Sequence, residues 1–534
     1  MNIPKTNFRQ WFEEKVDLGK DLPCIWFRDE MYTYGQVDAS VNKVANALYD
    51  LGVRKGTKVA IVMTNRPEFL YCWFGLAKLG AISLFVNVDF KEESLQYLLN
   101  QADAEFIIIN NDRWNNYAQV SNSLPKIKHA ICVPDARGID SKQVVGFDQL
   151  LRNVSSAALP LIDVDNGEPM GFIHTAGTTG APKWAMLSHK AYLTSGEYLR
   201  EWSMTNYTDI SFDPLPLFHI NPQTYFLMST LAGNGSVVIV EKYSASQFWK
   251  QVVKYKATLL VLHSAPIIYQ LARPVTPEET QHRVRMIPVA GVRIVMERFK
   301  IPVGGSGYGS TELPGFVVMH KHYLPIPRKM DHFGIMLTKF CGKPVDYVEV
   351  KVVDENDKEK AVNEMGEIIV RAKEPHVIFD GYYNMPDKNK QAFRNGWFHT
   401  GDGGRIDEEG NLIFEQRLAD SINVKGEWIP VEIVEAACIQ NPKIAEMALI
   451  AVQVDNITET KIIVRLHEGQ NMAPEELLDY LQTKLARFMI PTFVEFVKEF
   501  PRTKGTDKIQ KEVLRKEGIG KAWDREASGY KLQR

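Results

Sequence analysis

The stretch HTAGTTGAPK, residues 174–183, concentrates glycine, threonine and lysine in one place. Glycine lets backbone N–H groups approach a ligand closely, and threonine hydroxyls and a lysine ammonium add further hydrogen-bond donors. This composition suits the oxygens of a phosphate group, although a plain turn between two elements explains it equally well. The stretch does not fit the Walker pattern GxxxxGK[ST], so any phosphate site here is of another kind.

Four later segments also place polar and charged residues in glycine-rich turns or loops. They are GYGSTELPG (307–315), GWFHTGDGGRIDEEG (396–410), RLADSINVKGEWIPVEIVE (417–435) and PRTKGTDKIQKEVLR (501–515). Each has an ordinary structural explanation: an Asx turn for Asp402, a helix cap for Glu312, a core position for Tyr308 and a solvated surface position for Lys508. The order and spacing of the segments along the chain favour one shared chemical site.

The sequence between these segments predicts the elements that must position them. A helix is expected over 38–52, with a stop at Gly52, and a second helix over 67–81. Short, mainly apolar runs predict buried strands; they are 58–63, 81–87, 105–110, 129–134, 236–241, 258–263 and 285–291. Helices that alternate with such strands are typical of βαβ units, so the expected fold class is α/β with sheets covered on both faces.

The pattern changes in the last third of the chain. Near residue 345 alternating residues and turn-rich flanks predict antiparallel strands, as in 348–359 and 366–372. A smaller α+β region follows. It contains a predicted helix that begins at Pro474 and has Leu477, Leu478, Leu481 and Leu485 on one face. We therefore predict two domains, 1–416 and 417–534.

Length, charge and cysteine content narrow the class of protein. The chain has 534 residues, more than one ordinary core supports, and its formal net charge is −2, which gives no reason to expect nucleic acid. Its five cysteines are scattered without a CxxC pair, so a reducing, cytoplasmic location is expected. The N-terminus lacks the apolar run of a signal peptide, and no segment is predicted to span a membrane.

In this order the motifs resemble those of the adenylate-forming acyl-CoA synthetase (ANL) superfamily, over almost the whole chain. The stretches 214–224 and 240–258 are similar to the crotonobetaine/carnitine–CoA ligase branch. The resemblance implies a large N-terminal domain of stacked α/β sheets with a small β-barrel-like part, and a mobile C-terminal α+β lid. It also implies an AMP-forming ligase that uses ATP, Mg²⁺ and coenzyme A to convert a carboxylate, through acyl-AMP, into acyl-CoA.

The resemblance leaves the substrate and the acceptor open. The acid is expected to be small and polar (betaine-like) or of short to medium chain length, and an aryl acid is the alternative. An enzyme that passes acyl-AMP to another acceptor, and a non-catalytic nucleotide-binding protein on the same fold, are the rival hypotheses. A homodimer is compatible with the sequence.

The resemblance also implies roles for individual residues. The β- and γ-phosphates would contact Thr175, Gly177, Thr178, Thr179, Gly180 and Lys183. Adenine and the α-phosphate would lie against Tyr308, Gly309, Ser310 and Thr311, with Glu312 on Mg²⁺ and Asp402 and Arg417 on the ribose. Lys508 would reach the α-phosphate and the attacking carboxylate, and Gly426 would line the pantetheine tunnel. The acyl pocket would contain His219, Ile220, Gln223 and Trp184, with His219 as a gate or, alternatively, as a structural histidine.

The chain departs from the usual motifs at four places, one of which is a segment between Gly291 and Tyr308 that is shorter than usual. Trp184 follows Lys183 where glycine is usual, and the hinge position holds Ala419, with Asp420 beside it. The last loop has one residue more than usual before Lys508, which keeps Lys504 and Lys511 as alternatives.

Overall fold

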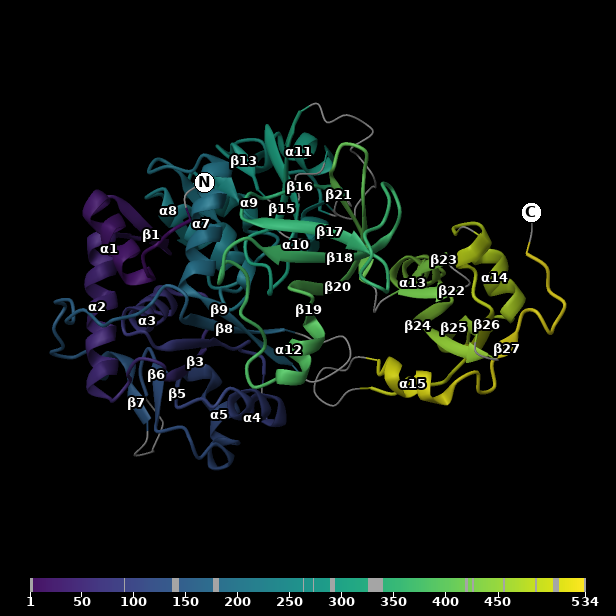
Figure 1. The fold of residues 1–534 in the computed structure, drawn as a ribbon, viewed down its shortest axis with the longest axis horizontal. Coiled ribbons are helices and arrows are strands. Elements are labelled where there is room, and N and C mark those ends of the chain that lie inside the picture. The colour runs from purple at the N-terminus through teal and green to yellow at the C-terminus, as the bar shows by residue number, and fades with distance from the viewer. Residues whose placement is uncertain are drawn as a thin grey trace.

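The computed structural model describes residues 3–532 except 91, 137–143, 176–181, 263, 272, 289–292, 325–339, 418–420, 425–426, 455–456, 486 and 503–508. Most of the chain forms one large body, and the C-terminal elements lie to one side of it (Figure 1). All five cysteines are buried and free. Within the described ranges, no helix has the length and apolar character needed to cross a membrane.

The first of two large sheets has seven strands in the order β7-β6-β5-β3-β4-β8-β9. All neighbours are parallel except β8 and β9, which are antiparallel. The strands are β3 (Lys58–Val62), β4 (Ile82–Phe85), β5 (Phe106–Asn110), β6 (His129–Val133), β7 (Val144–Gly146), β8 (Pro169–Thr175) and β9 (Lys183–Ser188). The parallel strands confirm the predicted α/β class.

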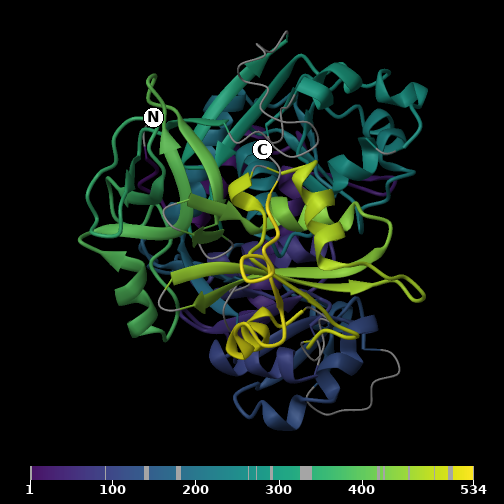
Figure 2. The ribbon, with the colours of Figure 1, turned by 90° about the vertical axis from the view of Figure 1, so that its right-hand side faces the viewer.

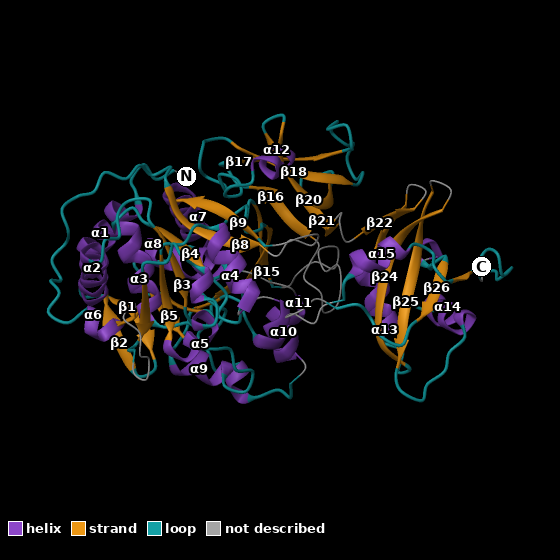
Figure 3. Cartoon of the chain, turned by 90° about the horizontal axis from the view of Figure 1, so that it is seen from below, coloured by secondary structure: helices purple, strands orange, loops and turns teal. Residues whose placement is uncertain are grey.

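The second large sheet has fourteen strands and changes character along its width. Its path is β17-β18-β20-β21-β16-β15-β14-β13-β12-β10-β11-β1-β2, with β19 paired to β20. The parallel part contains β1 (Pro23–Phe27), β10 (Ile210–Phe212), β11 (Ser236–Ile239), β12 (Leu259–Leu260), β13 (Met286–Ile287) and β14 (Val303–Tyr308), with β2 (Glu30–Thr33) antiparallel at the edge. The other end is antiparallel: β15 (Val318–Tyr323), β16 (Phe340–Pro344), β17 (Val348–Val353), β18 (Gly366–Ala372), β19 (Phe393–Arg394), β20 (Trp397–Ile406) and β21 (Leu412–Arg417). Strands β17, β18 and β20 gather at one side of the large body (Figure 3).

The helices of the large body pack on these sheets in one continuous core. They are α1 (Phe8–Gly19), α2 (Tyr34–Asp50), α3 (Pro67–Lys78), α4 (Glu92–Gln101), α5 (Trp114–Ala118), α6 (Phe147–Leu150), α7 (His189–Ser203), α8 (Ser229–Ala232), α9 (Phe248–Lys254), α10 (Ser264–Leu271), α11 (Arg293–Phe299) and α12 (Pro386–Ala392). Trp73 of α3 joins the layers, because its ring packs edge-on against both Phe85 of β4 and Tyr192 of α7, at 5.1 and 5.3 Å.

Local sequence explains where several helices begin. Asn7 and Gln10 form a reciprocal capping box at the start of α1, and Thr33 and Gln36 form another at α2. Ser188 caps α7 by accepting from the backbone N–H of Ala191. Helix α7 therefore starts directly where β9 ends.

The C-terminal part has its own sheet and cores. It contains β22 (Ser421–Val424), β23 (Glu427–Pro430), α13 (Val431–Ile439), β24 (Ile444–Val454), β25 (Ile457–Leu466), α14 (Pro474–Gln482), β26 (Phe493–Phe496), α15 (Lys511–Glu517) and β27 (Trp523–Asp524). Side chains of α13 and α14 pack on one face of β24 and β25, and Leu514 of α15 packs on the other. Figure 2, with this part toward the viewer, shows helices on both sides of its sheet.

The structure confirms most predicted elements but changes some bounds. The runs 258–263 and 285–291 form only the two-residue strands β12 and β13. Leu485 lies beyond the end of α14 at Gln482, although it still packs on the small core. Helix α1, strand β9 and a π-helix over Pro222–Met228 were not predicted.

The exact domain boundary stays a prediction. Strand β21 runs across it to Arg417, and residues 418–420 lie outside the described ranges.

Candidate functional site

The phosphate-type stretch joins two antiparallel strands. Strand β8 ends at Thr175 and β9 begins at Lys183, and these two residues are opposite each other in the register. The Thr175 hydroxyl oxygen is buried, and no hydrogen-bond partner for it exists among the described residues. Lys183 and Thr175 are thus held at the same end of the hairpin. Gly177, Thr178, Thr179 and Gly180 lie outside the described residues.

The second motif follows β14 as a tight turn. The backbone N–H of Leu313 donates to Ser310 O at 3.1 Å, and that of Val317 donates to Tyr308 O at 2.8 Å. A Cβ on Gly309 would lie 3.0 Å from both Leu313 O and Phe316 Cα, so a larger residue would push these backbone atoms apart slightly. Thr311, within the same turn, is half-buried.

A segment that the sequence did not point to joins these two motifs. The N–H of Tyr383 donates to Trp184 O at 2.9 Å, and the N–H of Met186 donates to Gly381 O at 3.0 Å, so residues 380–383 extend the edge of β9. The N–H of Phe379 donates to Glu312 O at 3.0 Å. This segment brings β9 and the Glu312 turn together.

Tyr382 lies at the centre of this junction. Its ring lies 4.1 Å from the Lys183 ammonium, and its hydroxyl donates to Glu312 Oε1 at 2.8 Å. The Ser310 hydroxyl donates to the other carboxylate oxygen of Glu312 at 2.9 Å. Tyr382 is only 6% exposed, so these contacts are shielded from water. The sequence signal was the pair Tyr382-Tyr383 after a glycine, but only the tertiary pairing shows its use.

Tyr308 and Asp402 meet across two strands. The Tyr308 hydroxyl donates to Asp402 Oδ2 at 2.7 Å, and both residues are buried. Burial, and then the negative charge of Asp402, raise the pKa of Tyr308 well above its ordinary value, which keeps the phenol a donor. Asp402 is opposite Arg417 in the register of β20 and β21. The Arg417 side chain lies outside the described ranges.

The strand around Asp402 is itself held by side chains. The Thr400 hydroxyl accepts from the Asp402 N–H at 3.0 Å and donates to Ile368 O at 2.6 Å. Glu367 accepts from the Gly401 N–H at 3.1 Å and contacts the His399 ring nitrogen at 2.9 Å. These contacts hold the backbone of the strand at Gly401 and Asp402.

The His219 segment is fixed by an asparagine and a glutamine. The Asn65 amide donates to Leu215 O and accepts from the Leu217 N–H, both at 2.8 Å. Gln223 is fully buried; its amide donates to Leu217 O and accepts from the Tyr192 hydroxyl, both at 2.8 Å. A π-helix begins just after His219, a feature frequent at functional sites.

His219 and His174 are two neutral imidazoles near the start of the phosphate-type stretch. His219 is exposed, yet the surrounding protein desolvates its ring and lowers its pKa. Burial, and to a lesser extent the charge of His219, lower the pKa of His174 to about 4. His174 packs edge-on against Phe90 at 5.1 Å and Trp184 at 5.9 Å. Both rings are therefore uncharged at neutral pH.

Two residues expected in the acyl pocket are instead part of the protein interior. Trp184 is 0% exposed, and its indole N–H donates to Leu98 O of α4 at 3.1 Å. Both ends of the Gln223 amide contact protein groups, as described above. Ile220 is also buried, at 5% exposure. Gly426, Ala419, Asp420, Lys504 and Lys508 lie outside the described residues, whereas Lys511 forms an ion pair with Glu435 at 2.8 Å.

Glu312 fits a magnesium ion that is held mainly by phosphate. Each of its oxygens accepts one protein hydrogen bond, and a carboxylate has roughly four lone-pair sites, so acceptor capacity remains. Mg²⁺ prefers oxygen ligands and commonly takes one or two carboxylates together with substrate phosphates. Within the described ranges, no three His, Cys, Asp or Glu side chains gather as a metal cage.

Comparison with known proteins agrees with this geometry. The AMP-binding enzyme family matches residues 12–383, and its C-terminal domain matches 433–505. The crotonobetaine/carnitine–CoA ligase of Escherichia coli (strain SE11) is 30% identical over 485 residues, which are 88% of this chain and 90% of that protein. The enzyme of the same name from Citrobacter koseri is 28% identical over 514 residues, 93% and 96% of the two chains.

Solved structures share the fold. An anthranilate CoA ligase in complex with anthranoyl-AMP has a TM-score of 0.77 at 24% identity and covers 97% of this chain and 98% of its own. The O-succinylbenzoate–CoA synthetase of Bacillus subtilis, solved with AMP, has a TM-score of 0.75 at 22% identity, covering 95% and 98%. With the family match over most of its length, the chain belongs to the AMP-binding enzyme family.

Proposed function

We propose that this protein is an ATP-dependent carboxylate–CoA ligase. In the first half-reaction a carboxylate oxygen bonds to the α-phosphorus of ATP, and the bond to the β-phosphate oxygen breaks to release pyrophosphate. In the second, the CoA sulfur bonds to the acyl carbon of acyl-AMP, AMP leaves, and the thiol proton passes to solvent. The alternative is an enzyme with the same first step and another acyl acceptor.

One observation supports this proposal: four segments far apart in sequence, each with a residue proposed to bind nucleotide or support its site, come into contact. Lys183 and Glu312 meet at Tyr382, and Tyr308 meets Asp402. Phosphoryl transfer depends on positioning and on stabilising charge rather than on protein covalent chemistry, and this arrangement supplies both.

Each part of the nucleotide then has a proposed contact. Asp402 and Arg417 hold the ribose, while Tyr308 and Gly309 pack against adenine. Ser310 orients Glu312, and Thr311 contacts the α-phosphate. The β- and γ-phosphates lie against Thr175, Gly177, Thr178, Thr179, Gly180 and Lys183. Mg²⁺, held by Glu312 and the phosphates, would offset the phosphate charge.

The C-terminal part supplies the remaining groups in this proposal. Lys508 brings a positive charge to the α-phosphate and the carboxylate as negative charge gathers there. Ala419 and Asp420 act as the hinge of a mobile lid that begins at residue 417, and Gly426 lines the path of the pantetheine arm. The ion pair between Lys511 and Glu435 favours Lys508 over Lys511 for this role.

The proposed acyl pocket around His219 favours a compact acid whose head group can carry a positive charge. His219 is the proposed gate, with Ile220 as an apolar contact. Because the rings of His174 and His219 are neutral at pH 7, they do not repel a cation. This agrees with the names of the curated relatives, so a betaine-like acid is the first candidate. Trp184 and Gln223 support the pocket from behind, because both are buried.

An aryl acid is the second candidate. The ring of Phe218 lies 4.5 Å from that of His219, and the ring of Phe90 lies 5.1 Å from that of His174. Aromatic surfaces of this kind pack against a planar acid as well as against a cation. A location in the cytoplasm and a homodimeric state complete the proposal; the buried, free cysteines support a reducing compartment.

The test is acid-dependent exchange of labelled pyrophosphate into ATP over a panel of acids. The panel contains carnitine, crotonobetaine, crotonate, butyrate, octanoate, benzoate and anthranilate. We expect exchange with a compact acid and strongest exchange with a betaine. Exchange with none of the acids, under conditions where ATP binds, would contradict the proposed substrate classes.

A charge variant sharpens the choice of acid. His219→Lys places a cation beside the head group. The factor by which KM rises should therefore be at least tenfold larger for crotonobetaine than for crotonate, which lacks the trimethylammonium group. Equal changes for the two acids would contradict a cationic head group near His219.

A further inference from the structure

Tyr382 contacts two groups of opposite charge through two different parts of its side chain. The face of its ring receives the Lys183 ammonium at 4.1 Å, well within the range of a cation–π interaction. Its hydroxyl donates to Glu312 at 2.8 Å. The two charged side chains that the proposed function assigns to the phosphates and to Mg²⁺ are therefore both oriented by one neutral residue.

The backbone of Tyr382 is held tightly enough to serve this role. The Asn389 side chain of α12 accepts from the Tyr382 N–H at 2.6 Å and donates to Tyr382 O at 2.9 Å. Tyr382 also forms a bridge with Ala185 of β9. A buried side chain fixed at its backbone presents its ring and hydroxyl in one geometry.

We propose that Tyr382 is a positioning residue that sets the lysine and the carboxylate of the nucleotide site with respect to each other. Tyr382 contacts the lysine through its ring and the carboxylate through its hydroxyl, so one rigid side chain sets the distance and direction between the two groups. This role rests on the proposed function.

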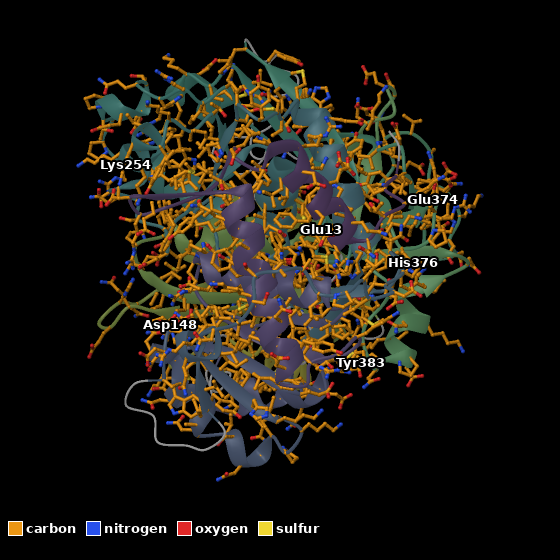
Figure 4. All side chains as sticks on the ribbon, turned by 90° about the vertical axis from the view of Figure 1, so that its left-hand side faces the viewer. Glu13, Asp148, Lys254, Glu374, His376 and Tyr383 are labelled. Carbon is orange, nitrogen blue, oxygen red and sulfur yellow. The ribbon has the colours of Figure 1, made fainter. Side chains whose placement is uncertain are left out.

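The two contacts can be separated by substitution. Tyr382→Phe keeps the ring against Lys183 and removes the hydrogen bond to Glu312, whereas Tyr382→Leu removes both of these contacts. Tyr383→Phe is the matched control: the Tyr383 hydroxyl donates to Asp103 at 2.9 Å, away from the nucleotide site. Figure 4 shows Tyr383 on a face of the molecule that also carries Glu374 and His376.

The experiment measures nucleotide binding by calorimetry without acid or CoA, using AMP, ATP with EDTA, and ATP with Mg²⁺. For Tyr382→Phe we expect the affinity for Mg²⁺-ATP to fall about tenfold, as for loss of a hydrogen bond to a charged group, while AMP and metal-free ATP bind as before. For Tyr382→Leu the affinity for metal-free ATP should also fall, by about fivefold, because the cation–π contact is lost. Tyr383→Phe should match the parent with all three ligands.

The outcomes distinguish this role from general damage and from failure of the proposed function. Equal weakening of AMP, ATP and Mg²⁺-ATP in Tyr382→Phe would show a merely structural role and overturn the inference. Unchanged Mg²⁺-ATP affinity in that variant would overturn it as well. If the parent protein binds none of the three nucleotides, the proposed function itself fails, and the inference falls with it.

Discussion

The Tyr308 hydroxyl donates to the Asp402 carboxylate at 2.7 Å, across 94 residues of sequence, in a fully buried contact. This hydrogen bond points one carboxylate oxygen toward the ring that is proposed to face adenine. The two residues thereby link the β14 turn to β20. If Asp402 binds the ribose as proposed, that contact depends on the Tyr308 side chain.

Tyr308→Phe should weaken AMP binding about tenfold, because a hydrogen bond to a charged group is worth roughly 1.5–3 kcal/mol. Calorimetric titration with AMP measures this directly. The control is Tyr347→Phe, since the Tyr347 hydroxyl is buried and has no hydrogen-bond partner among the described residues. Unchanged AMP affinity in Tyr308→Phe would show that the bond does not orient the ribose contact.

Lys508→Ala should slow acid-dependent pyrophosphate exchange by about a hundredfold or more, as expected when a charge-stabilising donor is removed. Thioester formation from supplied acyl-AMP should change only severalfold, because the proposed role belongs to the first half-reaction. Lys511→Ala is the control, since Lys511 forms an ion pair within the C-terminal part. If Lys504→Ala slows pyrophosphate exchange strongly and Lys508→Ala does not, the role belongs to Lys504.

Buried histidines make the fold sensitive to acid. Burial lowers the pKa of His189 to about 3, and burial together with the charge of His320 lowers that of His322 to about 4. An unfolded histidine binds a proton below about pH 6.5, so between pH 6.5 and 4 the unfolded chain takes up protons that the native state excludes. Stability must therefore fall as the pH falls through this window.

The free energy of unfolding falls between pH 7 and pH 5, and in His322→Gln this fall should be smaller by roughly 1–2 kcal/mol. Urea unfolding at both pH values measures it. The glutamine amide can still contact Ser306, whose hydroxyl lies 2.8 Å from the His322 ring nitrogen. An unaltered pH dependence in this variant would contradict the assigned pKa shift.

Asp213 behaves in the opposite direction. It follows β10 in a fully buried position, and burial raises its pKa to about 8. The native state keeps a proton that the unfolded chain releases above about pH 3.8, so the stability from this group falls as the pH rises from about 4 to 8. In the parent protein the Leu215 N–H donates to Asp213 Oδ1 at 2.8 Å. Asp213→Asn keeps an oxygen that can accept this hydrogen bond but removes the ionisable carboxyl group.

The Asp213→Asn variant should therefore be more thermally stable than the parent, by an amount that grows between pH 5 and pH 8. Thermal unfolding at several pH values measures it. A variant that is less stable at pH 8 would show that the carboxyl group has a partner that asparagine cannot replace.

Many strands and helices could be predicted from the sequence, because the patterns that indicate them lie within short stretches of the chain. Strands β3, β5 and β6 are mainly apolar runs, and α3 begins with proline and contains mostly core residues. Strand β9 was missed because Lys183 opens it and the residues before it suggest a loop. The π-helix over Pro222–Met228 has no simple periodic signal, and its hydrogen bonds depend on the packing around it.

The candidate site could be predicted only in part, because local sequence signals do not show which distant residues come into contact. The ordered motifs pointed to Lys183, Glu312, Tyr308 and Asp402, because each carries a chemical group in a glycine-containing motif. Their mutual contacts depend on long-range pairing, which no local pattern contains. Trp184 illustrates the limit: a large ring beside a predicted ligand loop suggested a pocket wall, but it points into the core.

The measurement that tests the central claim most directly is product analysis with Mg²⁺-ATP, the best acid from the exchange panel, and CoA. Mass spectrometry and nucleotide chromatography would follow acyl-CoA, AMP and pyrophosphate over time. We predict that the three products form in equal amounts and that omission of CoA stops turnover after acyl-AMP. Release of AMP without any acyl-CoA, at the same rate with and without CoA, would contradict a carboxylate–CoA ligase.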